Sequence, residues 1–283
     1  MRQTTKIIIG IISSIFALAL FFLIGFSCSE RRNWEGFGTP SFSVSQENRI
    51  EIETGSFRTV SFEVLGLGHP SDSPVYLSGE LCIRPVSEES GKQSLSVPEE
   101  VKEYLKLSIF GDTLLVSIDQ EAICRKIKTE YKPDENHKSK RLHLIKGLNL
   151  FLNTSIVDVI NKTNFQMTVQ DQKTDRVKLR SNSEISIVDC DITDLQFANN
   201  WRMTTIKNCK IRNLNLDLDE TKNWRAENSE IHTGNLSGGS RHDNVFPKGM
   251  VKEINWYPKH NDARLNLSLE GDSAKIVFAD KSK

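Results

Sequence analysis

The sequence predicts an all-β fold in the form of a parallel β-solenoid-like stack with coils of about 20 residues, preceded by one N-terminal hydrophobic helix. Three observations predict this fold. Apolar and polar residues alternate through most of the chain, which is typical of half-buried strands. Apolar positions recur at a fixed spacing between residues 187 and 216. A single long uncharged segment lies near the N-terminus, at residues 7–27.

The uncharged segment, IIIGIISSIFALALFFLIGFS, is long enough as a helix to cross a hydrocarbon core of about 30 Å. Three interpretations of residues 1–28 compete: a retained signal anchor, a lipoprotein signal with lipid attached at Cys28, and a cleaved secretory signal. The length favours the anchor, because cleaved signals have apolar runs of about 7 to 15 residues. All three export the rest of the chain, so we expect a membrane-anchored protein whose bulk is periplasmic or at the cell surface.

A polar segment and then the strands follow. Residues 29–45 contain glycine and proline and predict a tether between the membrane and a head domain, residues 46–249. Alternating apolar residues at 105–109 and 114–118 flank a Gly-Asp pair, which predicts a β-hairpin. Charged or Ser-rich loops are expected at residues 87–100 and 128–140.

A repeat occupies the second half of the head domain. The segments ISIVDCDITDLQF, residues 185–197, and TTIKNCKIRNLNL, residues 204–216, share apolar positions 19 residues apart. A coil of a parallel solenoid cannot bury its own inner face, so stacked coils bury it against each other. The matching pairs are Ile187 with Ile206, Cys190 with Cys209, Ile192 with Ile211, Leu195 with Leu214, and Phe197 with Leu216. A weaker third copy follows in phase, at Ala226, Ser229, Ile231, Gly234 and Leu236.

Two columns of the repeat carry a structural prediction. Cys190, Cys209 and Ser229 should form an inward column of small side chains, and the replacement of Cys by Ser counts against thiol chemistry. The adjacent column should be polar and hydrogen-bond the turn backbone. It consists of Asp189, Asn208 and Asn228.

The ends of the repeat are less regular. SIVDVINKTNF, residues 155–165, echoes SIVDCDITDLQF, residues 186–197, but lies further from it than one repeat length. An inserted loop such as DQKTDRVK, residues 171–178, would restore the period. Three strand-like runs within residues 250–283 are expected to cap the open end, because a solenoid must cover its terminal edges. A plain antiparallel sandwich is the competing architecture.

Charge and cysteine content exclude several functions. Lys plus Arg and Asp plus Glu both count 37, which disfavours nucleic-acid binding. The five cysteines include a candidate disulfide between Cys82 and Cys124. None lies at zinc-ligand spacing, so we expect no metal site and no cofactor.

Candidate binding residues come from a repeated tripeptide, NWR. Trp201 with Arg202 and Trp224 with Arg225 precede the second and third repeat strands. Such pairs can stack on sugars or bind a protein partner. The structural alternative is that each tryptophan covers the edge of the core at a solenoid corner.

The acidic residues give little support for catalysis. The outward positions Asp191, Lys210 and Glu230 alternate in sign, which predicts a solvated ladder of weak ion pairs. A hydrolase or lyase on a β-helix needs carboxylates that converge as acid and base. The only dense acidic run is Asp217, Asp219 and Glu220, and a solvated turn explains it equally well.

The chain resembles the auto-transporter adhesin head domain family, or GIN domains, of Bacteroidetes-like envelope proteins. The similar parts are IETGSFRTVSFEV, VKEYLKLSIFGDTLLVSID and the repeated C/S-x-I phrases, which span roughly residues 50–237. The resemblance implies a β-solenoid-like head without catalytic residues to transfer.

We therefore expect a non-catalytic, membrane-anchored envelope protein that acts in adhesion or as a scaffold and binds an envelope protein or a glycan. Two alternatives remain open. One is a carbohydrate-active enzyme, either a lyase or a hydrolase. The other is an accessory subunit of a membrane complex, for which the small residues Gly10, Ser13, Ser14 and Ala17 would allow close helix contact.

Overall fold

The structure is a computed structural model that describes residues 41–66, 75–86, 91–130, 143–155, 158–199, 202–246, 249–269 and 274–278. All described residues belong to one compact unit, Ser41–Lys283. The predicted signal segment 1–28, with Cys28, lies outside the described residues. Among the helices that are described, none is both long and apolar enough to span a membrane.

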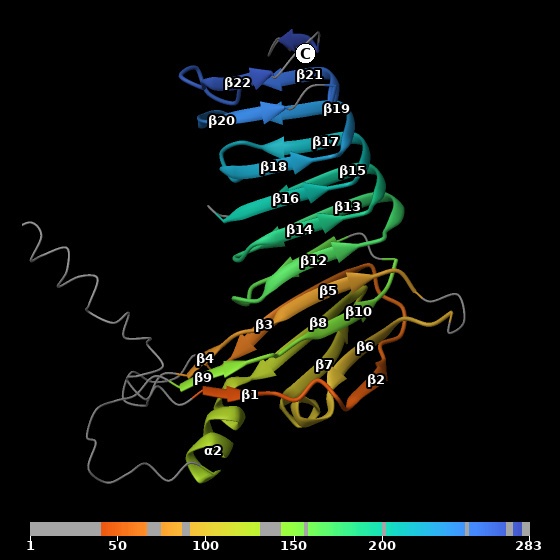
Figure 1. Cartoon of the computed structure of the whole chain (residues 1–283), viewed down its shortest axis with the longest axis vertical. Helices are drawn as coiled ribbons and strands as arrows, with labels where there is room; N and C mark the ends of the chain where they lie inside the picture. Colours follow the sequence, from red (N-terminus) through yellow and green to blue (C-terminus); the bar gives the residue numbers. More distant parts are fainter. Residues whose placement is uncertain are drawn as a thin grey trace, which may run out of the picture. The chain divides into compact units, whose positions relative to one another are not determined.

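Two large sheets, of eight and ten strands within the described residues, enclose one apolar core (Figure 1). The eight-stranded sheet has the order β18 (Asn223–Glu227), β16 (Met203–Lys207), β14 (Ile185–Val188), β12 (Gln166–Gln170), β5 (Glu80–Arg84), β10 (Leu150–Asn153), β6 (Ser94–Pro98) and β2 (Arg49–Glu53). The ten-stranded sheet has the order β23 (Lys275–Phe278), β21 (Val251–Tyr257), β19 (Glu230–Ser237), β17 (Lys210–Asp217), β15 (Asp191–Ala198), β13 (Lys173–Ser181), β11 (Asp158–Asn161), β3 (Thr59–Leu65), β8 (Thr113–Asp119) and β7 (Leu105–Phe110).

The remaining described elements are short. β1 (Ser41–Ser43), β9 (His143–Lys146) and β4 (Val75–Leu77) form a parallel sheet, and β20 (Ser240–Phe246) pairs with β22 (Leu265–Leu269). A 3-10 helix, η2 (Glu99–Tyr104), and an α-helix, α2 (Gln120–Glu130), are the described helices. The all-β fold class is confirmed, since the helices add little to it.

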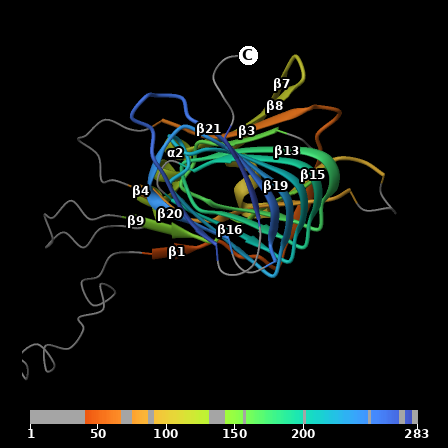
Figure 2. The ribbon, with the colours of Figure 1, turned by 90° about the horizontal axis from the view of Figure 1, so that it is seen from above.

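The predicted solenoid is confirmed by parallel pairing between successive coils. Figure 2 looks down the stack, with β13 and β15 on one side and β16 on the other. Ile187 lies opposite Ile206 and Ile192 opposite Ile211, which is the predicted register. The next coil is one residue longer, because Thr204 lies opposite Trp224. The side chains that were predicted to form an inward column, those of Cys190, Cys209 and Ser229, are buried.

The predicted polar column shapes the coil corners. Asp189, Asn208 and Asn228 have φ angles of 54°, 54° and 46°, in the left-handed region that Asn and Asp tolerate better than other non-glycine residues. Asn208 Nδ2 donates a hydrogen bond of 3.0 Å to Asp189 Oδ1 on the preceding coil. The corner residues therefore connect successive coils.

One predicted loop is a strand. Residues 173–181 form β13, in which Val177 lies opposite Leu195, and on the other sheet Met167 lies opposite Ile185. Both pairs are one residue closer in sequence than the corresponding pairs of the next coil. The prediction of an inserted loop at 171–178 was wrong, because this coil is shorter than the next rather than interrupted. Val177 and Leu179 are buried, so β13 contributes to the core.

Strands of the N-terminal half pair between strands of the later coils, which the repeat did not predict. β5 lies between β10 and β12, and β3 lies between β11 and β8, with parallel pairing throughout. β6 occupies part of the predicted loop 87–100, and its five residues are buried. The helix α2 begins where Asp119 Oδ1 accepts a hydrogen bond from the Ala122 N–H at 3.0 Å.

The two ends of the stack differ. At one end, β7 pairs antiparallel with β8, which confirms the predicted hairpin, and β2 pairs antiparallel with β6. At the other end, β21 and β23 continue the ten-stranded sheet in parallel. Ile276 and Phe278 on β23 are 41% and 71% exposed.

Candidate functional site

The outward face of the ten-stranded sheet is polar over β13, β15 and β17. On β13, the buried Val177 and Leu179 alternate with outward-facing Arg176, Lys178 and Arg180. Because strand residues alternate between faces, this pattern places three cations on one surface. Gln196 and Asn215 continue the same surface on the next two strands.

The three cations on β13 have different cross-strand neighbours. Arg176 lies opposite Asp194, and Lys178 lies opposite Asp158. Arg180 lies between Ile160 on one side and Ala198 on the other, so it has no acidic neighbour in register. Cross-strand pairs of opposite charge stabilise a sheet, and Arg180 lacks such a pair.

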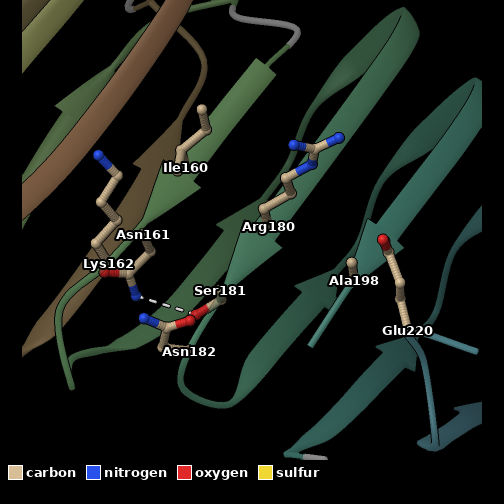
Figure 3. A pocket seen from close by; sticks show the side chains of 8 residues that line it. All are labelled: Ile160, Asn161, Lys162, Arg180, Ser181, Asn182, Ala198 and Glu220. Atoms are coloured by element: carbon tan, nitrogen blue, oxygen red, sulfur yellow. Dashed lines mark hydrogen bonds between the residues drawn. The ribbon is translucent and has the colours of Figure 1, made fainter. Parts of the chain in front are cut away.

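A pocket of about 250 Å³ opens beside Arg180 (Figure 3). It lies where β11, β13 and β15 end and where the turn after β17 begins. The small side chain of Ala198 leaves space that a larger outward residue would fill. The lining residues are Ile160, Asn161, Lys162, Arg180, Ser181, Asn182, Ala198 and Glu220.

The floor of the pocket is rigid. Asn161 is 1% exposed, and its Nδ2 donates to Phe165 O at 2.8 Å and to Ser181 Oγ at 3.1 Å. Its Oδ1 accepts hydrogen bonds from the N–H and the hydroxyl of Thr163. These four bonds use the hydrogen-bonding capacity of the amide, so Asn161 positions the corner and is not available to a ligand.

The charged groups of the pocket differ in their partners. Lys162 Nζ lies 3.5 Å from Glu63 Oε2, so its charge is partly compensated. Arg180 and Glu220 are exposed, and neither belongs to an ion pair within the described part of the chain. The pocket therefore presents one cation and one carboxylate that remain available.

Fixed amides extend this surface along the stack. A second hollow of about 210 Å³ is lined by Arg176, Val177, Asp194, Gln196 and Asn215. Three hydrogen bonds join outward side chains of neighbouring strands: Asn213 to Asp194 at 2.7 Å, Asn235 to Asn215 at 2.9 Å, and Asn255 to Asn235 at 3.0 Å. Because each amide is held by a neighbour, the surface offers hydrogen-bonding groups in defined positions.

The charges of Asp217, Asp219 and Glu220 all raise the pKa of Lys259, but of the three only the two aspartates form ion pairs with it. Asp217 forms a short ion pair with Lys259, whose pKa is raised by that hydrogen bond. Asp219 Oδ2 lies 3.9 Å from Lys259 Nζ, and its Oδ1 accepts the Gly239 N–H at 3.2 Å. Glu220 alone lines the pocket. The two aspartates therefore stabilise a turn, and among the described lining residues Glu220 has no second carboxylate as partner.

The tryptophan and arginine residues predicted from the sequence do not form one cluster. Trp224 packs against the core, with its ring 5.1 Å from that of Phe246 and its Nε1 donating to Asn244 Oδ1 at 3.1 Å. Arg225 is exposed and forms an ion pair with Glu227 at 3.2 Å. Arg202 is exposed, and Trp201 lies outside the described residues. Binding by these four residues stays a prediction.

The remaining sequence-derived sites concern the cysteines and metals. Cys82 is buried with a free thiol, and the side chain of Cys124 lies outside the described part, so a disulfide between them stays a prediction. No group of three or more His, Cys, Asp or Glu side chains suited to a metal ion occurs within the described residues.

No known protein-family description matches the chain, and no curated protein matches it. Several solved structures resemble it at low identity. A candidate adhesin from Bacteroides fragilis is 13% identical, covers 84% of this chain and 100% of its own, and gives a TM-score of 0.42. A candidate lipid-binding protein from Parabacteroides distasonis is 11% identical, with coverage of 85% and 100% and a TM-score of 0.34. A candidate adhesin from Parabacteroides merdae is 9% identical, with coverage of 85% and 100% and a TM-score of 0.30. Similarities at this level do not assign the chain to a family.

Proposed function

We propose that this chain is a non-catalytic binding protein of the cell envelope, and that the outward face of its ten-stranded sheet binds a glycan. The observation that carries the proposal is the pocket at Arg180, where a guanidinium and a carboxylate without ion-pair partners among the described residues lie on a rigid floor. The long uncharged segment at residues 7–27 supports a place in the envelope.

The chemistry of the surface suits a hydroxyl-rich ligand. Sugar hydroxyls both donate and accept hydrogen bonds, and the face presents amide, guanidinium and carboxylate groups side by side. The amides of Asn215 and Asn235 are held in place by their neighbours, which lowers the entropy lost when a ligand binds. A site on paired strands is also more rigid than a site on loops.

A binding role agrees better with the pocket than hydrolysis does. Glycosidases use two carboxyl groups on either side of the scissile bond, about 5 to 10 Å apart. Glu220 is the only carboxylate among the described residues that line the pocket, while Asp217 and Asp219 are engaged with Lys259. The pocket therefore supplies hydrogen-bonding groups without an acid and base pair.

A matched pair of substitutions on one coil tests the proposal. Ala198 and Ser186 are both small outward residues, but Ala198 lines the pocket and Ser186 lies on the eight-stranded sheet. In glycan-array binding followed by calorimetry on the full-length chain, we expect Ala198→Leu to reduce glycan affinity at least tenfold. Ser186→Leu should leave it within about twofold, because it alters the opposite face by a similar volume.

The melting temperatures of both variants show whether each one folds. The proposal would be contradicted if Ser186→Leu reduced binding as strongly as Ala198→Leu while both variants remained folded. It would also be contradicted if wild-type protein bound no glycan on the array.

A further inference from the structure

We propose that Arg180 recognises a carboxylate group of the ligand, so that the pocket selects acidic glycans, those built from carboxylate-bearing sugars, over neutral ones. This inference rests on the proposed function and specifies the ligand class of the same site. The juxtaposition that carries it is an exposed arginine whose two in-register neighbours are Ile160 and Ala198.

The outward cations of β13 differ in their cross-strand neighbours. Arg176 and Lys178 each lie opposite a carboxylate, Asp194 and Asp158 respectively. The strand therefore has a carboxylate in register with two of its outward cations, whereas Arg180 at the pocket has aliphatic neighbours on both sides. Opposite charges across neighbouring strands can stabilise a sheet, and Arg180 has no opposite charge in register.

The guanidinium group of Arg180 is suited to bind a carboxylate. Its planar fork matches a carboxylate with two parallel hydrogen bonds, which are stronger than hydrogen bonds between neutral groups.

Glu220 supplies a hydrogen-bond acceptor to the same pocket. Its carboxylate lines the same pocket and accepts hydrogen bonds only, so it suits the hydroxyl groups of a ligand and repels a second acidic group. A sugar that carries one carboxylate among several hydroxyls satisfies both Arg180 and Glu220. The volume of about 250 Å³ is below that of typical drug-sized pockets, about 300 to 1,000 Å³, and fits a single sugar ring.

An acidic peptide fits the site less well. Extended peptides usually bind by adding a strand to a free sheet edge. β13 is paired on both sides, with β11 and with β15, so no backbone edge is free at the pocket. A ligand must therefore bind through side chains on the sheet face, which suits a sugar better than an extended peptide.

The test uses the full-length chain, with matched ligands and matched variants. The ligands are a panel of uronic-acid and nonulosonic-acid oligosaccharides and the methyl ester of each, which removes the charge but keeps the hydroxyls. The variants are Arg180→Gln and, as control, Lys207→Gln, which removes an exposed cation from β16 on the eight-stranded sheet. Calorimetry gives the dissociation constants, and melting temperatures confirm folding.

We expect at least one acidic oligosaccharide to bind tenfold or more tightly than its methyl ester. Arg180→Gln should abolish this preference, whereas Lys207→Gln should change affinity less than threefold. If acidic and esterified oligosaccharides bound equally and Arg180→Gln had no effect, the inference would be overturned while glycan binding stood. Binding of poly-glutamate that matched the acidic glycans in strength and in dependence on Arg180 would overturn the choice of glycan. Absence of binding to any glycan would overturn the proposed function as well.

Discussion

At the scale of single residues, the corners of the coils depend on side chains that tolerate a left-handed backbone. Asp171, Asp189, Asn208 and Asn228 all have positive φ angles between 46° and 57°. For other non-glycine residues this conformation costs about 1 to 2 kcal/mol. Asn and Asp reduce the cost by local hydrogen bonding, and the bond between Asn208 and Asp189 also links two coils.

We predict that Asn208→Ala lowers the free energy of unfolding by about 1 to 2 kcal/mol, because alanine lacks the side chain that stabilises this backbone. Asn208→Gly should cost less, since glycine adopts φ near 54° without steric strain. Urea denaturation of both variants checks the order. Equal losses for glycine and alanine would show that the hydrogen bond to Asp189, which both variants lack, outweighs the backbone conformation.

Buried thiols predict a dependence of stability on alkaline pH. The hydrogen bond between Cys190 and Cys209 lowers the pKa of Cys209. Burial raises the pKa of Cys82, and the bond to Cys209, with burial, raises the pKa of Cys190. Above pH 9.0, the ordinary thiol value, the unfolded chain loses these protons while the folded chain keeps them. The contribution is therefore complete below that pH and declines as pH rises above it.

The corresponding measurement is the urea midpoint at intervals from pH 7 to pH 10. We expect a shallower decline above pH 9 in a Cys82→Ser, Cys190→Ser double variant, because serine does not ionise in this range. Serine occupies the next position of the Cys190 column at Ser229, so the fold accommodates serine there, and the urea midpoint at pH 7 checks that the double variant folds. Identical pH profiles for both proteins would contradict the assignment to these thiols.

At the scale of elements, the coil that carries the candidate site is the one that the sequence pattern missed. Apolar residues at a constant spacing predicted β14 to β17 correctly, including the inward column at Cys190 and Cys209. The coil containing β13 is one residue shorter than the next, and its charged residues resemble a loop. Arg180 was therefore not predicted as a site residue, because its outward direction follows only from the burial of its neighbour Leu179.

For a related reason, the sequence did not predict which residues from different coils share the site. Glu220 belongs to an acidic run that suggested catalysis, but it alone of the three lines the pocket, while Asp217 and Asp219 form ion pairs with Lys259. Those contacts join residues about 40 positions apart in sequence. Periodicity within a coil does not contain this information.

Two glycines test how closely the woven N-terminal strands pack. At Gly79, just before β5, an added Cβ would lie 2.2 Å from the backbone oxygen of Leu148. At Gly234 on β19, it would lie 3.5 Å from the ring of Phe246, which is ordinary contact. We predict that Gly79→Ala destabilises by about 3 kcal/mol or more, since backbone must move.

Gly234→Ala is the matched control and should be neutral or stabilising by about 0.5 to 1 kcal/mol, because glycine weakens a strand interior. Thermal unfolding followed by circular dichroism compares the two variants. Equal melting temperatures for Gly79→Ala and wild type would contradict the close approach of β5 to the segment before β10.

At the scale of the whole molecule, stacked coils should behave as nearly independent units joined by their interfaces. The strands β15 and β19 lie on either side of β17, and both pair with it in register. Their apolar residues therefore occupy corresponding positions. The strands β3 and β5, in contrast, should not behave as independent units. Each pairs with strands that come much later in the sequence.

Deletion of residues 203–222, one whole coil, should therefore give a folded, shorter solenoid that unfolds cooperatively at a lower temperature. Met203 lies opposite Asn223, so the deletion restores the register of the next coil. Deletion of residues 203–212 removes half a coil and should abolish folding, because it leaves an inner face uncovered. Circular dichroism and thermal unfolding distinguish the two. Loss of folding in both deletions would contradict the modular account.

The central claim is that ligand binds on the outward face of the ten-stranded sheet, at the pocket beside Arg180. Methyl resonances of the full-length chain, labelled at alanine and isoleucine, report on that face directly. Ala198 and Ile160 line the pocket, whereas Ala226 and Ile50 belong to the eight-stranded sheet. On titration with the tightest-binding acidic oligosaccharide, the account predicts shifts at Ala198 and Ile160 with Ala226 and Ile50 unchanged. Shifts at Ala226 and Ile50 without any at Ala198 and Ile160 would contradict it.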